Sequence, residues 1–221
     1  MFLRKKEKNN VFGTLYNGIN KRKIPSFKKE SFSNLEHLKL GMIGNFYNNG
    51  RDQLTVCEAA KLMHQKGLQF NLDFVGGADG KKKPYLNICT EFVFTNELAG
   101  CISFVGFQNN ALSLLREWDA FVYSSNRDTF GIAVVEAMMA GIPVIVNDLD
   151  VFVEITENGK HATLYKTKDP EDLARKIEAY IIDPTPFHEK AQKAAIYARE
   201  KFSIEKHYNS LIEIYKTLLQ S

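Results

Sequence analysis

Short apolar runs of strand length alternate with helical patterns along most of the chain, beginning at Leu38. The runs predict strands over residues 38–43, 70–75, 102–105, 120–123, 143–146 and 162–165. The stretches between them predict helices over residues 52–66, 83–98, 111–116, 130–140 and 170–182. Runs such as 120–123 and 143–146 are apolar almost throughout, which is typical of parallel strands buried on both faces. The alternation therefore predicts an α/β fold built on a doubly wound parallel sheet.

Two further helices are predicted after the last strand, over residues 186–201 and 204–219. Both are rich in polar residues, and the second repeats apolar residues at helical spacing, at Tyr208, Leu211, Ile212, Tyr215 and Leu218. These helices are an addition to the alternating pattern at the C-terminal end.

The composition is that of one ordinary globular domain, with 221 residues and 44% hydrophobic content. No apolar run approaches the length of a membrane span, and the first ten residues lack the apolar core of a signal peptide, so a cytoplasmic location is expected. Cys57, Cys89 and Cys101 have neither CxxC spacing nor a histidine at ligand spacing. They are expected to be reduced packing residues, and no metal site is predicted.

The charge is unevenly distributed along the chain. Residues 1–30 carry nine Lys or Arg and two Glu, whereas the rest of the chain holds 20 basic and 24 acidic residues. Two interpretations of this basic arm stay open: a solvated tail, or a peripheral contact with anionic lipid or with an acidic partner. A nucleic-acid partner is not expected, because no basic face interleaved with aromatic residues and no groove-reading motif is present.

One carboxylate interrupts an otherwise apolar helical stretch at residues 128–146, DTFGIAVVEAMMAGIPVIV. Glu136 has apolar neighbours on every side and no nearby Lys or Arg, and a buried carboxylate needs hydrogen-bond donors. Because side chains on a helix lean toward its N-terminus, Glu136 should lie over the turn of Ile132 and Ala133, beside free N–H groups that bind phosphate. The pattern predicts a ligand that carries hydroxyls next to a diphosphate, as a nucleotide ribose does.

The same stretch resembles the signature of the retaining GT-B glycosyltransferases, in which an acidic residue and a Glu are separated by seven residues around a Phe-Gly. The matching residues are Asp128, Phe130, Gly131, Glu136, Ala137, Ala140, Gly141, Pro143 and Val144. Segments 103–110, 118–125 and 150–165 resemble further parts of the nucleotide-binding half of that family, in the same order. The resemblance implies a Rossmann-like domain, the C-terminal half of a GT-B fold.

By position, the resemblance gives Asp128 a contact with the donor sugar; a helix N-cap is the structural alternative for this residue. The loop of residues 44–51 begins with Gly44 and places Arg51 where the family has a phosphate-binding Lys, and Asn45 where it has an Arg. Asp128 and Arg51 are therefore the predicted catalytic residues. The predicted donor-binding residues are Gly44, Asn45, Phe107, Gln108, Phe130, Gly131, Ile132, Ala133 and Glu136.

Within this set, Phe130, Gly131, Ile132 and Ala133 are expected to act through their backbone N–H groups, and residues 107–108 to hold the nucleobase. Core packing is the alternative for Phe107. No Asp-x-Asp pair follows a strand, which agrees with a mechanism that needs no metal cofactor.

Residues 14–27 resemble the segment by which the family leaves its first domain. Residues 1–34 are therefore expected to be a basic arm and linker-like segment, and residues 35–221 the donor domain, with an N-terminal acceptor domain supplied in cis or in trans. The implied function is transfer from a UDP-sugar or GDP-sugar to a glycan or lipid-linked saccharide with retention, as in polysaccharide biosynthesis. Two alternatives stay open: a non-catalytic nucleotide-sugar-binding subunit, and an epimerase or phosphorylase of similar fold.

Overall fold

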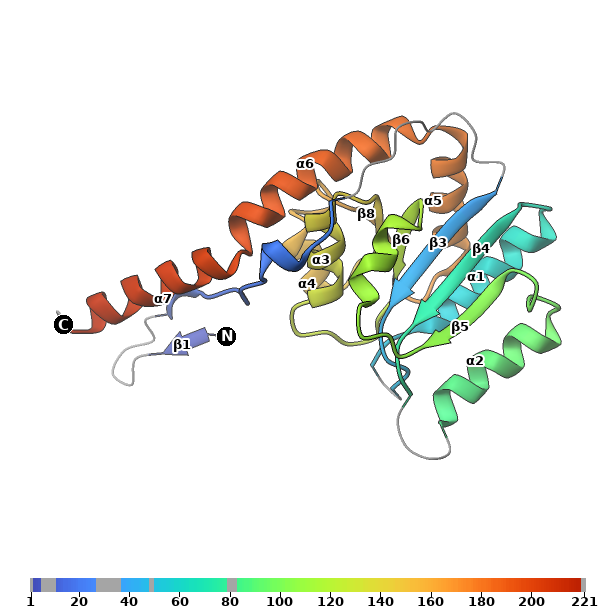
Figure 1. Cartoon of the computed structure of the whole chain (residues 1–221), viewed down its shortest axis with the longest axis horizontal. Helices are drawn as coiled ribbons and strands as arrows, with labels where there is room; N and C mark the ends of the chain where they lie inside the picture. The colour runs from blue at the N-terminus through green and yellow to red at the C-terminus, as the bar shows by residue number, and fades with distance from the viewer. Residues whose placement is uncertain (1, 5–10, 27–36, 48–49, 79–82, 220–221) are drawn as a thin grey trace.

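The computed structural model describes residues 2–4, 11–26, 37–47, 50–78 and 83–219. Within these ranges the predicted doubly wound α/β architecture is confirmed (Figure 1). A six-stranded sheet has the order β5-β4-β3-β6-β7-β8, and all neighbouring strands are parallel. The strands are β3 (Leu38–Ile43), β4 (Phe70–Val75), β5 (Ile102–Gly106), β6 (Ala120–Tyr123), β7 (Val144–Asn147) and β8 (Thr163–Tyr165).

The chain winds outward from the centre of this sheet in both directions. The first half passes from β3 through α1 (Gln53–Gln65) to β4 and through α2 (Pro84–Thr95) to β5. The second half starts beside β3 at β6 and passes through α3 (Ile132–Ala140) to β7 and α4 (Asp150–Ile155) to β8. The order reverses between β3 and β6, and ligands of open α/β sheets bind outside the carboxyl ends of the strands at this point.

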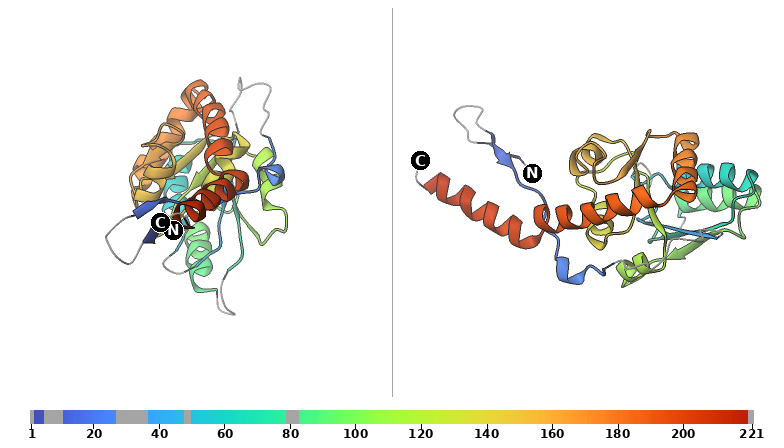
Figure 2. Two further views of the ribbon diagram at one scale, coloured as in Figure 1. Left: turned by 90° about the vertical axis from the view of Figure 1, so that its left-hand side faces the viewer. Right: turned by 90° about the horizontal axis from the view of Figure 1, so that it is seen from above.

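Helices cover both faces of the sheet. Helix α1 packs with α2 and with α5 (Pro170–Ile182), whereas α3 packs with the 3-10 helix η2 (Ala111–Arg116) and with α6 (Thr185–Lys201). Figure 2 shows α1 and η2 on opposite sides of the sheet. The strands between them are buried, and β6 and β7 are buried at every position, as their apolar sequences predict.

Three elements differ from the sequence prediction. Residues 111–116 form a 3-10 helix, the short helix α4 was not predicted, and α3 begins at Ile132 instead of residue 130. The later start has a local cause: Gly131 adopts φ +82°, in the left-handed region, which a regular helix excludes. The turn before α3 is therefore a separate structural unit.

The N-terminal segment returns to the body of the protein. After β1 (Phe2–Arg4) and β2 (Val11–Thr14), and before the short helix η1 (Lys21–Lys23), Ile19 pairs with the junction between α6 and α7 (Ile204–Leu219). Its N–H donates to the carbonyl of Phe202 at 2.8 Å, and its carbonyl accepts from Ile204 at 3.0 Å. Ile19 and Ile24 join the hydrophobic core. The predicted linker-like segment is thus packed against the predicted donor domain.

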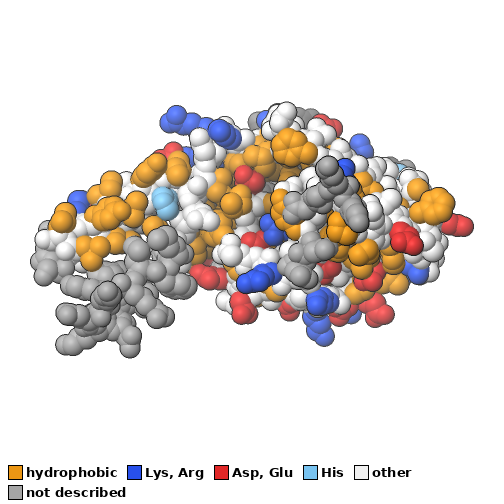
Figure 3. Space-filling view, turned by 90° about the horizontal axis from the view of Figure 1, so that it is seen from below, with side chains coloured by type: hydrophobic (Ala, Val, Ile, Leu, Met, Phe, Trp, Pro, Cys, Tyr) orange, Lys and Arg blue, Asp and Glu red, His pale blue; other side chains and the backbone are white. Residues whose placement is uncertain are grey.

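Most of the predicted basic arm has no described side chains. Lys21, Arg22 and Lys23 are described, and Lys21 lies 3.6 Å from Glu205, while the other basic residues of this arm fall outside the described side chains. Helix α7 extends from the body, and Figure 3 shows apolar side chains gathered along it. They include Tyr208, Ile212, Tyr215 and Leu218.

Candidate functional site

A pocket of about 250 Å³ opens at the carboxyl ends of β3 and β4, beside the N-terminus of α3. This is the edge of the sheet at which parallel strands present ligand-binding loops. Its lining residues come from five separate segments: Ile43, Gly44, Asn45, Arg51, Val75, Gly76, Phe107, Gln108, Ala111, Ile132, Ala133 and Glu136. Eight of the eleven predicted site residues line this pocket. Asp128, Phe130 and Gly131 do not.

The N-terminus of α3 points free backbone donors at this pocket. By helix geometry, the N–H groups of Ile132, Ala133 and Val134 have no partner within the helix. The corresponding groups of Phe130 and Gly131 are occupied, since they donate to Asp128 Oδ1 at 3.1 and 2.8 Å. The expectation that all four predicted N–H groups are available is therefore corrected to Ile132 and Ala133, because the turn that precedes the helix uses the other two.

Phe130 has a different place from the one predicted. Its ring is buried and packs against Tyr16 and Phe202, with ring centroids 6.3 and 5.7 Å apart. It lines a smaller hollow of about 100 Å³ between the N-terminal segment and α4. In that hollow the Tyr16 hydroxyl donates to Glu154 Oε1 at 2.8 Å. Phe130 thus anchors the turn before α3 to the rest of the domain.

Arg51 is the cation of the larger pocket, and it is paired with Asp128. Arg51 Nη1 lies 2.9 Å from Asp128 Oδ2 and 3.5 Å from Ser125 Oγ, and its guanidinium carbon lies 5.2 Å from the centre of the Tyr123 ring. The side chains of Arg51 and Asp128 are 28% and 8% exposed. The two residues predicted to be catalytic are therefore in direct contact, which the sequence did not reveal.

Asp128 caps a turn but is not the N-cap of α3, which is Gly131. Its Oδ1 accepts the N–H groups of Thr129, Phe130 and Gly131 at 2.8, 3.1 and 2.8 Å. The capping alternative is thus correct in kind but misplaced by three residues. The carboxylate holds the turn that aligns the start of the helix.

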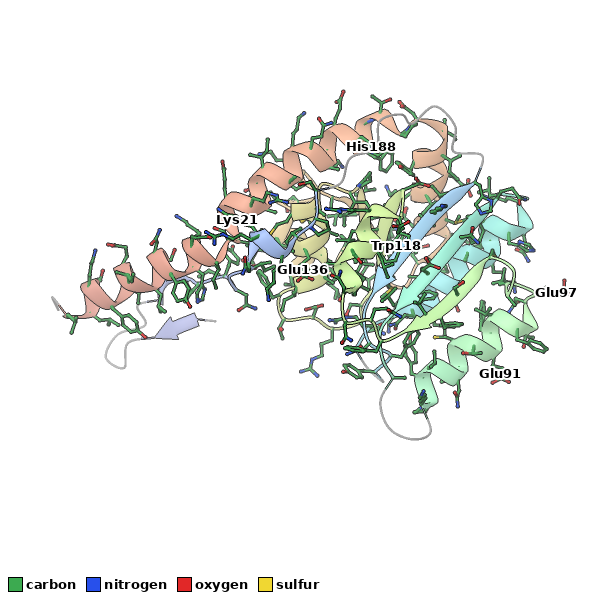
Figure 4. The ribbon with its side chains drawn as sticks, viewed as in Figure 1. Lys21, Glu91, Glu97, Trp118, Glu136 and His188 are labelled. Carbon is green, nitrogen blue, oxygen red and sulfur yellow. The ribbon has the colours of Figure 1, made fainter. Side chains whose placement is uncertain are left out.

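Glu136 lies one turn into α3, on the face that borders the pocket (Figure 4). The helix was expected to be buried on all sides, but Ile132 is exposed and Ala133 and Glu136 are half-buried, so this expectation was wrong for one face. No salt bridge of the described residues includes Glu136. Burial raises the pKa of its carboxyl from 4.5 to about 7. A ligand that brings hydroxyl donors would favour the ionised form.

The stability of the protein is expected to fall as the pH rises from about 4.5 to about 7, because of Glu136. The folded chain holds the Glu136 proton up to about pH 7, whereas the unfolded chain releases it near its ordinary pKa of 4.5, so folding binds a proton in this window. Thermal unfolding of the wild type and of Glu136→Gln at pH 5 and pH 7.5 measures the effect. The difference between the two midpoints should shift in favour of the variant at the higher pH; parallel behaviour of the two proteins would contradict the assignment.

Asn45 and Gln53 shape the loop that carries Arg51. Asn45 Oδ1 accepts the N–H of Gly77 at 2.8 Å, and its Nδ2 donates to the Tyr47 hydroxyl at 2.7 Å, so Asn45 joins two loops of the pocket. The buried Gln53 donates from Nε2 to the carbonyls of Gly44 and Asn45 at 3.1 and 3.3 Å. Sequence reasoning missed Gln53, because a glutamine at a helix start carries no pattern that distinguishes it from a surface residue.

Phe107 is 71% exposed at the end of β5, so the core-packing alternative is wrong. Its neighbour Gln108 is also exposed, and its Nε2 lies 3.5 Å from the carbonyl of Val105. An open aromatic ring on the wall of a pocket offers a flat surface for stacking.

Two other classes of site were searched for within the described residues. No group of three or more His, Cys, Asp or Glu side chains is arranged to hold a metal ion. No described helix is both long enough and apolar enough to cross a membrane.

Comparison with known proteins gives a family match and several distant relatives. The sequence model of the family described as Glycosyl transferases group 1 matches residues 23–201. The chain is 29% identical over 126 residues to N,N'-diacetylbacillosaminyl-diphospho-undecaprenol alpha-1,3-N-acetylgalactosaminyltransferase of Campylobacter jejuni, a match that covers 57% of this chain and 31% of that protein. It is 26% identical over 167 residues to D-inositol 3-phosphate glycosyltransferase of Rhodococcus erythropolis, covering 75% and 38%. The matches span less than half the length of these two relatives.

Solved structures share the fold. The Anabaena protein Alr3699/HepE, crystallised with UDP and glucose, superposes with a TM-score of 0.80 at 21% identity, covering 91% of this chain and 56% of that one. The C-terminal domain of a glycosyl transferase group 1 family protein (LpcC) from Francisella tularensis gives a TM-score of 0.66 at 22% identity, covering 86% and 96%. The second comparison equates nearly a whole C-terminal domain with this chain.

Proposed function

The chain belongs to the glycosyl transferases group 1 family, and from this membership we propose that its pocket binds the nucleoside diphosphate part of a sugar donor. The observation that carries the proposal is a convergence. A guanidinium, the open N-terminus of a helix and a half-buried carboxylate face one pocket at the carboxyl edge of the sheet.

The diphosphate is assigned to the N-terminus of α3 and to Arg51. The N–H groups of Ile132 and Ala133 and the positive end of the helix dipole attract an anion, and Arg51 adds a full positive charge. When the bond to the sugar breaks, negative charge develops on the departing diphosphate, and these fixed positive groups stabilise it. They supply that charge without a metal cofactor.

The ribose is assigned to Glu136 and the base to the wall near Phe107. Glu136 lies four residues beyond Ile132, which is about 6 Å along the helix axis, so its carboxylate can accept hydroxyl donors beside the diphosphate. Phe107 and Gln108 come from the end of β5, where an open ring and backbone groups can hold a base.

The reaction proposed for the protein is retaining transfer of the sugar from a UDP-sugar or GDP-sugar to a glycan or lipid-linked saccharide. The named relatives include transferases of both undecaprenol-linked and soluble acceptors, so the acceptor class stays with the proposal. We assign acceptor binding to a second domain, supplied in cis or in trans, because the residues of this pocket account for the donor alone.

A non-catalytic donor-binding subunit is the second candidate, and one observation favours it. The place of a second family cation is taken by Asn45, which bonds to Gly77 and Tyr47, and Arg51 is the one cation among the residues that line the pocket. A transfer assay with and without an acceptor-binding domain separates the candidates. Donor binding without transfer in both arms would support the subunit.

Isothermal titration with UDP, GDP and ADP tests the proposed binding. At least one of the three is expected to bind with a dissociation constant in roughly the micromolar to millimolar range, as substrates of this kind do. The folded state of the protein is verified by a cooperative thermal transition in the same buffer. Absence of binding by all three nucleotides would overturn the proposal.

A further inference from the structure

The carboxylate of Asp128 has no capacity left for a ligand hydroxyl. Its Oδ1 accepts three backbone N–H groups, from residues 129–131, and its Oδ2 accepts from Arg51 Nη1 at 2.9 Å and from the Tyr123 hydroxyl at 3.2 Å. A carboxylate offers about four lone-pair positions, and five donors already share them. The side chain is 8% exposed and does not line the pocket. The position that resembles a sugar-contacting acid is therefore engaged by the protein itself.

Arg51, in contrast, keeps donors free while it is held in place. One nitrogen is fixed by Asp128, and Nε is buried without a hydrogen-bond partner among the described residues. The stem of Arg51 lies against Gly44, where an added Cβ would meet Cγ, Cδ and Nε at 3.3 Å. Since Gly44 and Arg51 both line the pocket, the guanidinium is oriented before any anion arrives.

Tyr123 supports this arrangement from below. It is fully buried at the end of β6, its ring lies beneath the guanidinium, and its hydroxyl donates to Asp128. Burial raises the pKa of Tyr123, so the hydroxyl keeps the proton that it donates. A buried residue at this depth acts on a ligand through Arg51 and Asp128.

We propose that Asp128 and Tyr123 are positioning residues that hold the Arg51 guanidinium toward the pocket, and that Asp128 does not contact the donor sugar. The inference rests on the proposed function, because it takes the pocket as a diphosphate site. A guanidinium that is already oriented loses less side-chain entropy when it binds phosphate. The turn that Asp128 also holds aligns the N-terminus of α3 with the same anion.

The first arm of the test uses no ligand. In ¹⁵N-labelled protein, the Arg51 side-chain NMR signal is identified as the one that Arg51→Lys removes. Asp128→Asn keeps an oxygen for the turn but presents an NH₂ group to Arg51, so the guanidinium signal should move toward those of exposed arginines. Tyr123→Phe should shift it less. The control is Tyr165→Phe, which removes another buried hydroxyl, bonded to the Tyr123 carbonyl at 3.4 Å, without touching Arg51.

The second arm compares UDP with UDP-glucose, and GDP with GDP-mannose, on the wild type and Asp128→Asn. A positioning residue changes the affinity for the diphosphate and for its sugar conjugate by the same factor, within about twofold, as expected of a term that the two ligands share. A sugar contact lowers the affinity for the conjugate alone, and this result would overturn the proposal. So would an Arg51 signal that Asp128→Asn leaves unchanged. If no nucleotide binds the wild type, the proposed function fails, and the NMR arm decides the positioning role separately.

Discussion

Replacing Arg51 by glutamine is expected to weaken nucleoside diphosphate binding by about 10- to 100-fold, the range for losing a hydrogen-bonded charge worth about 1.5–3 kcal/mol. Two effects add. The pocket loses the one cation among its lining residues, and the Asp128 carboxylate loses its partner at 2.9 Å and then repels the incoming phosphates. Titration calorimetry of the variant against the wild type measures the loss.

Arg127→Gln is the matched control, because Arg127 is an exposed arginine in the same loop that does not line the pocket. It removes the same charge and should change the affinity by less than about threefold, since exposed charges are screened. The double variant Arg51→Gln with Asp128→Asn should bind more tightly than Arg51→Gln alone, because it removes the repulsion. An Arg51→Gln protein that is folded and binds nucleotide like the wild type would refute the assignment of Arg51.

Gly131→Ala is expected to destabilise the protein by about 2–4 kcal/mol, the sum of a left-handed backbone penalty and overpacking. Gly131 has φ +82°, and an added Cβ would lie 2.7 Å from the Phe152 ring and 3.3 Å from Ile155. Both neighbours belong to α4, and Phe152 is fully buried, so they have little room to move. The start of α3 would shift instead, and nucleotide affinity would fall together with stability.

Gly67→Ala separates the two contributions to this loss. Gly67 has nearly the same backbone angle, φ +77°, but an added Cβ would meet nothing within 4 Å. Its substitution should therefore cost only the backbone part, about 1–2 kcal/mol, and leave nucleotide affinity unchanged. Chemical denaturation of both variants gives the comparison. Equal losses in the two proteins would show that contact with Phe152 contributes nothing.

The sequence alone determined the sheet and the general place of the pocket. The predicted bounds of β3, β4 and β6 match the structure, because strands buried on both faces must be continuously apolar, and this constraint is written in consecutive residues. Glu136 was placed beside the turn of Ile132 and Ala133, and all three line one pocket. That result follows from helix geometry, which is local and needs no knowledge of the rest of the chain.

Tertiary structure alone decided which polar groups meet. Arg51 and Asp128 come from different halves of the chain and become neighbours because β3 and β6 lie side by side at the centre of the sheet. The same strand order brings Tyr123 beneath them, and the pairing of Ile19 with the α6–α7 junction is equally non-local. Local patterns encode burial and periodicity, whereas the partner of a charged side chain depends on strand order and loop path, which no short window of sequence contains.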